Sequence, residues 1–326
     1  MRANPDPADP RLVARLVAWA RRLADRDACG PVAVLSHRTG ELVLRAGGVV
    51  VKAHAPGVDL ADLRPRLALA ERLDGVMLAP LAGAALGGRT VTLWPAGTAL
   101  READLPGVDW RAAGGLLAAL HRAPVPAGLP ECGAPARVQR ARRRLMAGRH
   151  ATGRRARAVA GALAPVAPLT TVAPLTTVAR LTTVAPGGQA DRPPPGGQAD
   201  RPRTLVHGDF HLGQLVRRAG GWRLIDVDDL GLGDPAWDLA RPAAWFAAGV
   251  IAPETWAEFV AGYRAAGGPA VPADGDPWPV LDPFARALTA QIAALAVVNG
   301  HLDVAEAYVA CCRRIVTMYP PGATHE

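Results

Sequence analysis

The sequence predicts an α+β protein with two lobes, in which a small antiparallel sheet precedes a larger helical region. Two observations support this prediction. Short β-like runs joined by tight turns occupy much of the first hundred residues, and long helical patterns dominate from residue 109 onward. Strands that come first and helices that follow are typical of α+β folds, whereas a parallel-sheet protein alternates the two. We therefore expect an N-lobe over residues 1–97 and a C-lobe over residues 98–326.

Local patterns predict the elements of the N-lobe. Residues 11–27 space their apolar side chains at three and four, which indicates an amphipathic helix. Residues 59–74 are also expected to be helical, followed by a strand at Val91–Trp94, a break at Pro95-Ala96-Gly97 and a helix over 109–122. Between the first two helices lie three β-like runs separated by turn residues: Val32–Ser36, Leu42–Arg45 and Val49–His54.

The middle of the chain differs in composition from both lobes. Nine arginines lie in residues 137–157, a hexapeptide repeats over 166–183, and GGQADRP occurs at 187–193 and again at 196–202. These periods are shorter than the roughly 20 residues of a solenoid unit. Tandem Pro, Gly and Thr favour a solvated segment without a core. We predict a disordered low-complexity insert over residues 164–203.

After this insert, regular patterns return. Thr204–Val206 and Trp222–Val227 are predicted strands, and helical spacing fills residues 235–248, 253–266 and 282–317. The C-lobe is therefore expected to be mostly helical.

Size and composition exclude several classes of protein. The chain has 326 residues, half of them hydrophobic, and can bury a sizeable core. Neither a secretory leader nor an uncharged apolar run of about 18 residues is present, so a membrane-spanning helix is not expected. The cysteines lack the density of a disulfide scaffold and the spacing of a zinc site: Cys29, Cys132, Cys311 and Cys312. These features predict a cytoplasmic protein.

The net charge of +8 is weak support for a nucleic-acid partner. Lys52 is the only lysine, so 36 of the 37 basic residues are arginine, and asparagine occurs only twice. Such a composition indicates a GC-rich genome rather than selection for phosphate binding. The arginine-dense residues 137–157 also lack interleaved aromatic residues, so we expect a solvated helix there. A single surviving lysine is a candidate for a task that arginine cannot perform.

Residues 205–240 contain the side chains with the clearest chemistry. A short apolar strand ends at His207-Gly208-Asp209, Gln214 follows, and Asp226 lies near the end of the next strand. Phosphoryl transfer from Mg-ATP needs one carboxylate at the acceptor hydroxyl, and a second carboxylate with a neutral oxygen for the metal ion. Mg²⁺ prefers oxygen ligands and usually takes one or two protein carboxylates. Asp226 and Gln214 fit this second role, because the strands of one hairpin would bring them to the same edge.

Two segments resemble the aminoglycoside phosphotransferase and choline kinase-like family, which is related to the protein kinases. Residues 207–214, HGDFHLGQ, are similar to the catalytic loop HGD-x-H-x-x-N, and residues 225–240 match each fixed position of the family's metal-binding segment. The resemblance implies a protein-kinase-like α+β fold with ATP between the lobes. It also implies that Asp209 is the catalytic base and that Asp226 is the principal Mg²⁺ ligand.

The resemblance has one departure and several further implications. Gln214 stands where the family usually has asparagine, and its amide oxygen lies one methylene further out. Maltokinases of the same superfamily look similar at this position, which opens a sugar-kinase interpretation. Asp234 and Asp238 are expected to brace the loop by hydrogen bonds rather than to touch substrate.

The nucleotide-binding residues of the N-lobe follow from the same resemblance. Lys52 in the third strand would contact the α- and β-phosphates of ATP. Glu71 is the acid expected to pair with it, although Arg66 could occupy that place on the helix. Trp94 and Ala96 lie where the hinge between the lobes should bind adenine, mainly through backbone groups.

Other residues in the motif region have structural interpretations beside functional ones. His207 and His211 are expected to brace the catalytic loop. Asp228 and Asp229 fit either a second metal or acceptor site or solvated turn carboxylates. Core packing is expected, rather than a stacking cage for an acceptor, for three tryptophans: Trp237, Trp245 and Trp256.

The sequence constrains the acceptor less than the reaction. Between Arg223 and Glu258 the chain carries seven acids and two arginines, which suits a cationic, amine-bearing acceptor. The resemblance likewise implies an aminoglycoside or similar antibiotic, with a sugar or other metabolite hydroxyl as the alternative. Two other classes stay open: a nucleotide-binding pseudokinase that acts as an interaction module, and an RNA-associated protein that uses residues 137–157. The expected partners are ATP, Mg²⁺ and a small-molecule hydroxyl, with no membrane.

Overall fold

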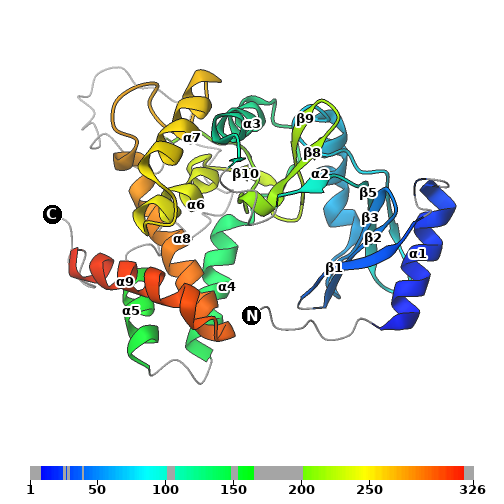
Figure 1. Cartoon of the computed structure of the whole chain (residues 1–326), viewed down its shortest axis with the longest axis horizontal. Helices are drawn as coiled ribbons and strands as arrows, with labels where there is room; N and C mark the ends of the chain where they lie inside the picture. The colour runs from blue at the N-terminus through cyan, green and yellow to red at the C-terminus, as the bar shows by residue number, and fades with distance from the viewer. Residues whose placement is uncertain are drawn as a thin grey trace, which may run out of the picture.

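An antiparallel sheet with strand order β1-β2-β3-β5-β4 forms the N-lobe of the computed structural model, and a mostly helical C-lobe follows it (Figure 1). The structure describes residues 9–24, 27, 30–38, 40–100, 107–147, 153–164 and 201–318. The sheet strands are β1 (Val32–Arg38), β2 (Glu41–Ala46), β3 (Val49–Ala53), β4 (Ala82–Ala85) and β5 (Thr90–Pro95). The two-lobed α+β prediction is confirmed.

The two faces of this sheet have different chemistry because side chains alternate along a strand. One face is apolar and packs against helix α1 (Pro10–Ala24), which covers the outer side of the sheet (Figure 1). On the opposite face, Lys52 of β3 lies directly across from Thr92 of β5. Helix α2 (Leu60–Arg72) begins at Asp59, whose carboxylate accepts a hydrogen bond from the backbone N–H of Ala61.

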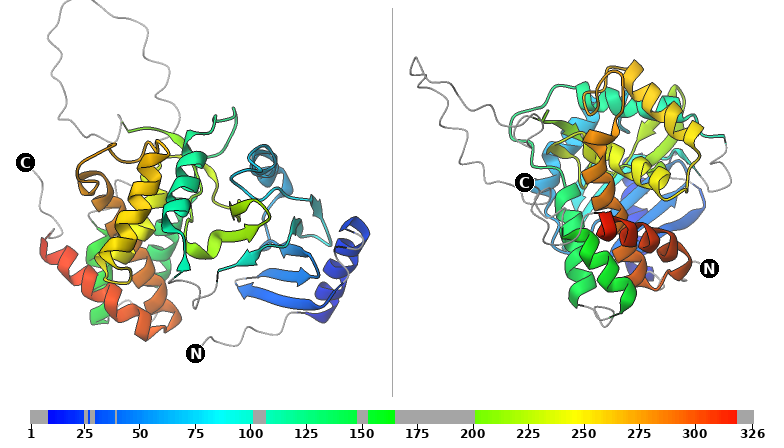
Figure 2. Two further views of the ribbon diagram at one scale, coloured as in Figure 1. Left: turned by 45° about the horizontal axis from the view of Figure 1, so that its top comes forward. Right: turned by 90° about the vertical axis from the view of Figure 1, so that its left-hand side faces the viewer.

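A small sheet joins the lobes. Strand β6 (Thr98–Ala99) pairs with β8 (Leu215–Arg218), which forms a hairpin with β9 (Gly221–Leu224). This hairpin lies between the N-lobe sheet and the C-lobe helices (Figure 2). Glycine is required at position 97, because a Cβ atom there would lie 2.7 Å from Cβ of Val216.

The C-lobe packs its helices around α8 (Trp278–Asn299), which contacts four other helices. Although α8 is long and apolar enough to span a bilayer, 67% of its most apolar window is buried, so it is a core helix. Two short strands, β7 (Thr204–Val206) and β10 (Gly231–Gly233), pair with each other in antiparallel orientation. The remaining helices are α3 (Trp110–Arg122), α4 (Ala134–Ala147), α5 (Arg154–Leu163), α6 (Ala236–Ala247), α7 (Pro253–Ala265) and α9 (Leu302–Met318).

Several elements differ from the sequence prediction. The helical pattern predicted over 282–317 is divided between two helices, α8 and α9, because Gly300 adopts a left-handed conformation with φ of 73° and ends α8. The described part of the arginine-dense stretch lies in α4 and α5, whose buried apolar faces pack on α8 and α9. Strand β4 was not predicted, because its sequence of alanine and glycine carries no β-like pattern.

The predicted insert lies mostly outside the described residues, since 165–200 are not among them. Its expected C-terminal end is part of the C-lobe. Arg201 forms an ion pair with Asp234, and Arg203 pairs with Glu131 at 2.5 Å. Residues 201–203 therefore belong to the C-lobe, although their composition placed them in the insert.

Candidate active site

The loop that carries Asp209 follows β7 directly. Gly208 adopts a φ of 81°, and a Cβ atom there would lie 2.3 Å from the carbonyl oxygen of Asp229. Glycine is therefore required at this position by both conformation and space. The ring of His207 accepts a hydrogen bond from the backbone N–H of Asp209 (3.3 Å) and donates one to the carbonyl oxygen of Ile225 (2.8 Å). His207 therefore links the catalytic loop to the residue before Asp226.

Asp238 is completely buried and accepts hydrogen bonds from the same loop. Its carboxylate accepts hydrogen bonds from the backbone N–H groups of His207 (2.7 Å) and Gly208 (2.9 Å). The ring of His121 lies 2.9 Å from the same carboxylate. Asp234 instead accepts from Arg201 and from the backbone N–H of Ala236. Both aspartates hold structure in place, as the sequence suggested.

A cluster of one lysine and three carboxylates lies between the lobes; we call it the lysine cluster. Its members are Lys52 and Glu41 from the N-lobe sheet, and Asp226 and Asp228 from the loop after β9. The Nζ atom of Lys52 lies 2.9 Å from Asp226, 2.7 Å from Asp228 and 3.5 Å from Glu41. Burial by itself lowers the pKa of Lys52, but the neighbouring carboxylates outweigh it and raise that pKa above its usual value. Lys52 is therefore a fixed positive charge.

Asp226 has an unusual backbone conformation. Its φ is 72°, and it is the only non-glycine residue with positive φ among those described. Such a conformation costs free energy and is found mainly where surrounding structure imposes it, often at functional sites. Here the hairpin imposes it: the backbone N–H of Ile225 donates to Gln214 (2.9 Å), and the Gln214 amide nitrogen lies 3.5 Å from the Asp226 carboxylate. The structure thus brings Gln214 and Asp226 together, as predicted.

A second charged cluster surrounds Asp209; we call it the arginine cluster. Arg137 of α4 and Arg241 of α6 each lie 2.9 Å from a different oxygen of the Asp209 carboxylate. Arg137 also donates a 2.9 Å hydrogen bond to Asp229. Burial raises the pKa of Asp209 more than the two guanidinium groups lower it. Arg140 lies at the edge of the cluster, 3.8 Å from Asp229.

Glu71, the acid expected to pair with Lys52, is placed differently from the prediction. Glu71 is exposed on α2, and no hydrogen bond or ion pair links it to Lys52 in the described part of the chain. The rotation of α2 explains this, because its buried face includes Leu63 and Leu67, and Arg66 donates to the carbonyl oxygen of Leu230 (2.7 Å). Glu41 of β2 is instead the N-lobe acid that pairs with Lys52.

The two predicted hinge residues lie at and just after the end of β5. The backbone N–H of Ala96 donates to Gly48 (2.6 Å), and its carbonyl oxygen accepts from Arg218. Both backbone groups of Ala96 are therefore engaged within the protein in this conformation. Trp94 is buried, lies on the same sheet face as Lys52, and donates from its indole nitrogen to Thr92 (2.9 Å).

The acids of residues 223–258 do not form a free anionic surface. Six of the seven have a basic partner: Lys52 for Asp226 and Asp228, Arg137 for Asp229, Arg201 for Asp234, His121 for Asp238 and Arg111 for Glu258. The seventh, Glu254, is exposed in the first turn of α7. The charge argument for an amine-bearing acceptor is therefore not supported by the structure.

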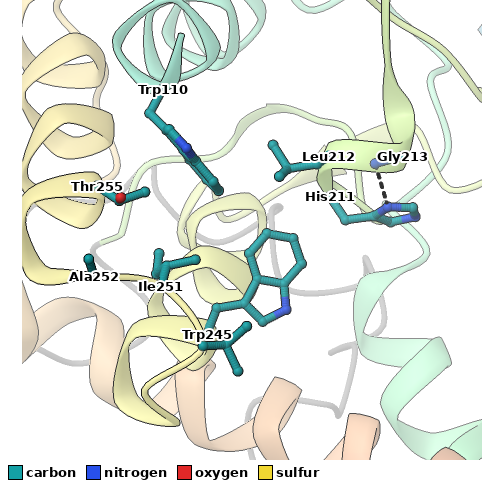
Figure 3. A pocket seen from close by; sticks show the side chains of 9 residues that line it. Trp110, His211, Leu212, Gly213, Trp245, Ile251, Ala252 and Thr255 are labelled. Carbon is teal, nitrogen blue, oxygen red and sulfur yellow. Dashed lines mark hydrogen bonds between the residues drawn. The ribbon is translucent and has the colours of Figure 1, made fainter. Parts of the chain in front are cut away.

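A pocket of about 430 Å³ lies beside the catalytic loop (Figure 3). Trp110 of α3 and Trp245 of α6 form its aromatic walls, with their rings edge to face at 6.4 Å. His211 and Leu212 contribute the loop side. Trp245 therefore lines a pocket. Trp237 and Trp256, which were also predicted to pack in the core, are buried.

The donor set around Asp226 fits a magnesium ion that also binds nucleotide phosphates. A carboxylate oxygen of Asp226 lies 3.5 Å from the Gln214 amide, which presents its oxygen in place of its nitrogen when it rotates by half a turn, and the other Asp226 oxygen accepts from the backbone N–H of Asp228. Among the described residues, no group of three or more His, Cys, Asp or Glu side chains could hold a metal ion by itself. Mg²⁺ itself needs few protein ligands and completes its shell with phosphate and water.

Sequence reasoning missed Glu41, Arg137 and Arg241. Glu41 is the first residue of β2. A single acid directly after a turn carries no pattern that predicts a contact with Lys52. Arg137 was assigned to a solvated helix, although its position one turn after Gly133 places it beside the catalytic loop. Arg241 directly follows the metal-binding motif, which was the available signal.

Comparisons with known proteins agree with this geometry. A family model described as "Phosphotransferase enzyme family" matches residues 1–284. Choline kinase from Cryptosporidium parvum Iowa II is similar in structure, with a TM-score of 0.63, 10% identity, and coverage of 95% of this chain and 96% of that one. An amicoumacin kinase in complex with AMP-PNP and Ca²⁺ has a TM-score of 0.59 and 16% identity, covering 98% and 96%.

A third solved structure, aminoglycoside phosphotransferase APH(3'')-Id from Streptomyces rimosus, has a TM-score of 0.54 and 16% identity, covering 87% and 99%. No curated protein sequence matches the chain. At these identities the solved structures establish the kinase-like fold, and the family model establishes the family.

Proposed function

This chain belongs to the phosphotransferase enzyme family, and we propose that it transfers the γ-phosphoryl group of ATP to a hydroxyl group of a small molecule. The observation that carries the proposal is the ion pair between Lys52 of the N-lobe and Asp226 of the C-lobe, at 2.9 Å. It joins a phosphate-binding cation to a metal-binding carboxylate at the interface of the lobes, next to the loop that holds Asp209. The amicoumacin kinase with bound AMP-PNP supports ATP as the donor.

The residues have distinct roles in this proposal. Lys52 binds the phosphates of ATP, and Asp226 with Gln214 would hold Mg²⁺, which neutralises charge on the phosphates when bound. Asp209 orients the acceptor hydroxyl and accepts its proton. The acceptor oxygen forms a bond to the γ-phosphorus, the bond from that phosphorus to the bridging oxygen breaks, and ADP leaves. Catalysis then rests on positioning and on fixed charges rather than on a covalent intermediate.

Amine-bearing antibiotics are the acceptor class that the resemblance implies. An aminoglycoside acceptor would make this chain an antibiotic-resistance enzyme, and the similarity to APH(3'')-Id supports that candidate. The acids near the site are paired with basic side chains, so they give no support to an amine-bearing acceptor.

A sugar hydroxyl is the second candidate acceptor, and a specific observation favours it. Trp110 and Trp245 present aromatic surface in the pocket beside His211 (Figure 3). Aromatic walls with a few polar groups are typical of sites that bind small molecules through their apolar faces. Gln214 agrees with this candidate, because maltokinases resemble the chain at the same position.

We place the reaction in the cytoplasm. The three described cysteines, Cys132, Cys311 and Cys312, are buried as free thiols, which suits a reducing compartment.

ATP consumption with Mg²⁺ tests the proposal, using pooled aminoglycosides, peptide antibiotics and simple sugars as acceptors. We expect turnover that depends on one pool and falls by about 10²–10⁴-fold in Asp209→Ala, as is usual when a catalytic base is removed. Glu258→Gln, on the exposed surface of α7, is the control that keeps turnover. Nucleotide binding without turnover in any pool would instead favour a pseudokinase that serves as an interaction module.

A further inference from the structure

The surroundings of Asp209 do not suit a cationic acceptor. Each of its two carboxylate oxygens lies 2.9 Å from a guanidinium nitrogen, one from Arg137 and one from Arg241. An acceptor hydroxyl that reaches Asp209 must therefore come close to both guanidinium groups. At such separations a second positive charge is repelled and a negative charge is attracted.

The local charges favour an anion on the acceptor side. Within the arginine cluster, three guanidinium groups surround two carboxylates, because Arg140 joins Arg137 and Arg241 around Asp209 and Asp229. Asp229 cannot offer an oxygen freely, since it accepts from Arg137 and packs against Gly133, where a Cβ atom would lie 1.7 Å from its Oδ1.

Arg241 has binding capacity left. It donates from Nη2 to Asp209, while its Nε–H is buried and has no hydrogen-bond partner among the described residues. A buried donor without an acceptor costs free energy, so an incoming anionic oxygen would be stabilised there. The guanidinium fork also suits carboxylate and phosphate oxygens better than a hydroxyl alone.

We propose that the acceptor carries a carboxylate or phosphate near the hydroxyl that is phosphorylated, and that Arg137 and Arg241 bind this anion. The inference rests on the proposed function and specifies its acceptor class. When the anion binds, it replaces Asp209 as a ligand of one arginine. This frees a carboxylate oxygen of Asp209 to take the proton of the acceptor hydroxyl. The two arginines thus determine specificity and couple acceptor binding to the release of the base.

The γ-phosphate of ATP is a second anion that could meet these arginines. The placement favours the acceptor, because Arg137 and Arg241 come from helices α4 and α6 of the C-lobe, whereas the nucleotide cation Lys52 comes from β3. The experiment must separate the two sources.

Two matched series of probes test the inference with the full chain, Mg²⁺ and AMP-PNP: glucuronate, glucose and glucosamine, and glycerate, glycerol and 3-aminopropane-1,2-diol. Binding is measured by calorimetry, and turnover is measured separately with ATP. We expect the acid of at least one series to bind about 10-fold or more tightly than its neutral and amine counterparts, a difference of about 1.4 kcal/mol. Preference for the neutral or amine probes, or equal binding in both series, overturns the inference.

Variants then assign the effect to the two arginines. Arg137→Gln and Arg241→Gln should remove the acid preference and leave AMP-PNP affinity unchanged. Arg137→Lys keeps the charge without the fork and should retain part of the preference, which also serves if a Gln variant fails to fold. Arg155→Gln, on α5 and paired with the exposed Glu306, is the matched control. Loss of AMP-PNP affinity in the arginine variants, with the acid preference kept, would assign them to the γ-phosphate and overturn the inference.

The same data distinguish failure of the inference from failure of the proposed function. Turnover of a neutral or amine acceptor that is lost in Asp209→Ala leaves the phosphotransferase proposal intact and removes the anionic acceptor. Absence of both nucleotide binding and turnover removes the proposed function itself.

Discussion

The two charged clusters of this protein are built from similar side chains in opposite proportions. In the lysine cluster, three carboxylates surround one ammonium group, and the cluster joins the two lobes. In the arginine cluster, guanidinium groups from two C-lobe helices enclose Asp209 and Asp229. A surplus of carboxylate attracts a further cation, whereas a carboxylate already held by arginine does not. In the proposed function, the lysine cluster binds metal and nucleotide, and the arginine cluster faces the acceptor.

The largest effect is expected for a variant that disrupts the lysine cluster. Lys52→Met removes the only ammonium group among Glu41, Asp226 and Asp228, so Mg²⁺-dependent turnover should fall by about 10²–10³-fold, as for other preorganised charges at a transition state. Steady-state kinetics with varied ATP measure this.

Lys52→Arg is the companion that separates charge from shape. It keeps a positive charge among the three carboxylates, so its thermal unfolding midpoint should stay closer to that of the unaltered protein than the midpoint of Lys52→Met. Its turnover should still be low, because the broad guanidinium cannot replace a compact ammonium. Full turnover in Lys52→Arg would show that charge alone suffices in the lysine cluster.

A change beneath the catalytic loop should loosen both clusters together. Asp238→Asn keeps the size of the side chain but replaces one acceptor oxygen by an N–H donor that faces the backbone N–H groups of His207 and Gly208. We expect the free energy of unfolding to fall by about 3 kcal/mol, since a buried ionic acceptor is lost. Urea unfolding measures this, with Glu258→Gln as the surface control. A change as small as that of the control would mean that the loop does not depend on Asp238.

The smallest expected effect is a shift in pH dependence that belongs to the arginine cluster alone. The charged groups that face Asp209 are Arg137 and Arg241 from helices α4 and α6 and Asp229 from a loop, and the titratable ring of His207 also lies beside it. Burial raises the pKa of Asp209 above its usual value of about 3.9. Because only the ionised carboxylate accepts a proton, kcat/KM should fall as the pH falls through this raised pKa.

Arg137→Gln sharpens that measurement. Removing one positive charge raises the pKa of Asp209 further, so the acidic limb should move to higher pH. A limb that stays in place, or that moves to lower pH, would indicate that another group controls it. Since Lys52 lies in the other cluster, Lys52→Arg should leave the limb unchanged.

Local patterns sufficed for the elements and for part of the site. Strand and helix periodicity predicted β1, β2, β3 and β5, and the hairpin argument placed Gln214 beside Asp226. That argument succeeded because the two residues are only twelve positions apart and lie at the ends of adjacent strands, where Leu215 pairs with Leu224.

Partners that depend on packing could not be predicted in the same way. The acid nearest Lys52 in the N-lobe is Glu41 rather than Glu71, because the rotation of α2 is decided by which of its leucines enter the core. The split of the last long helix depended on one glycine conformation at Gly300.

The sequence by itself determined the reaction chemistry of this protein, because its motif residues lie within 36 consecutive positions of the chain, 205–240. Only the tertiary structure decided which charges meet: Lys52 and Asp226 are 174 positions apart, and Asp229 lies 92 positions from Arg137. An arginine on a helix surface carries no local sign of its partner. Whether it faces water or a catalytic carboxylate depends on how that helix packs, which is a property of the whole core.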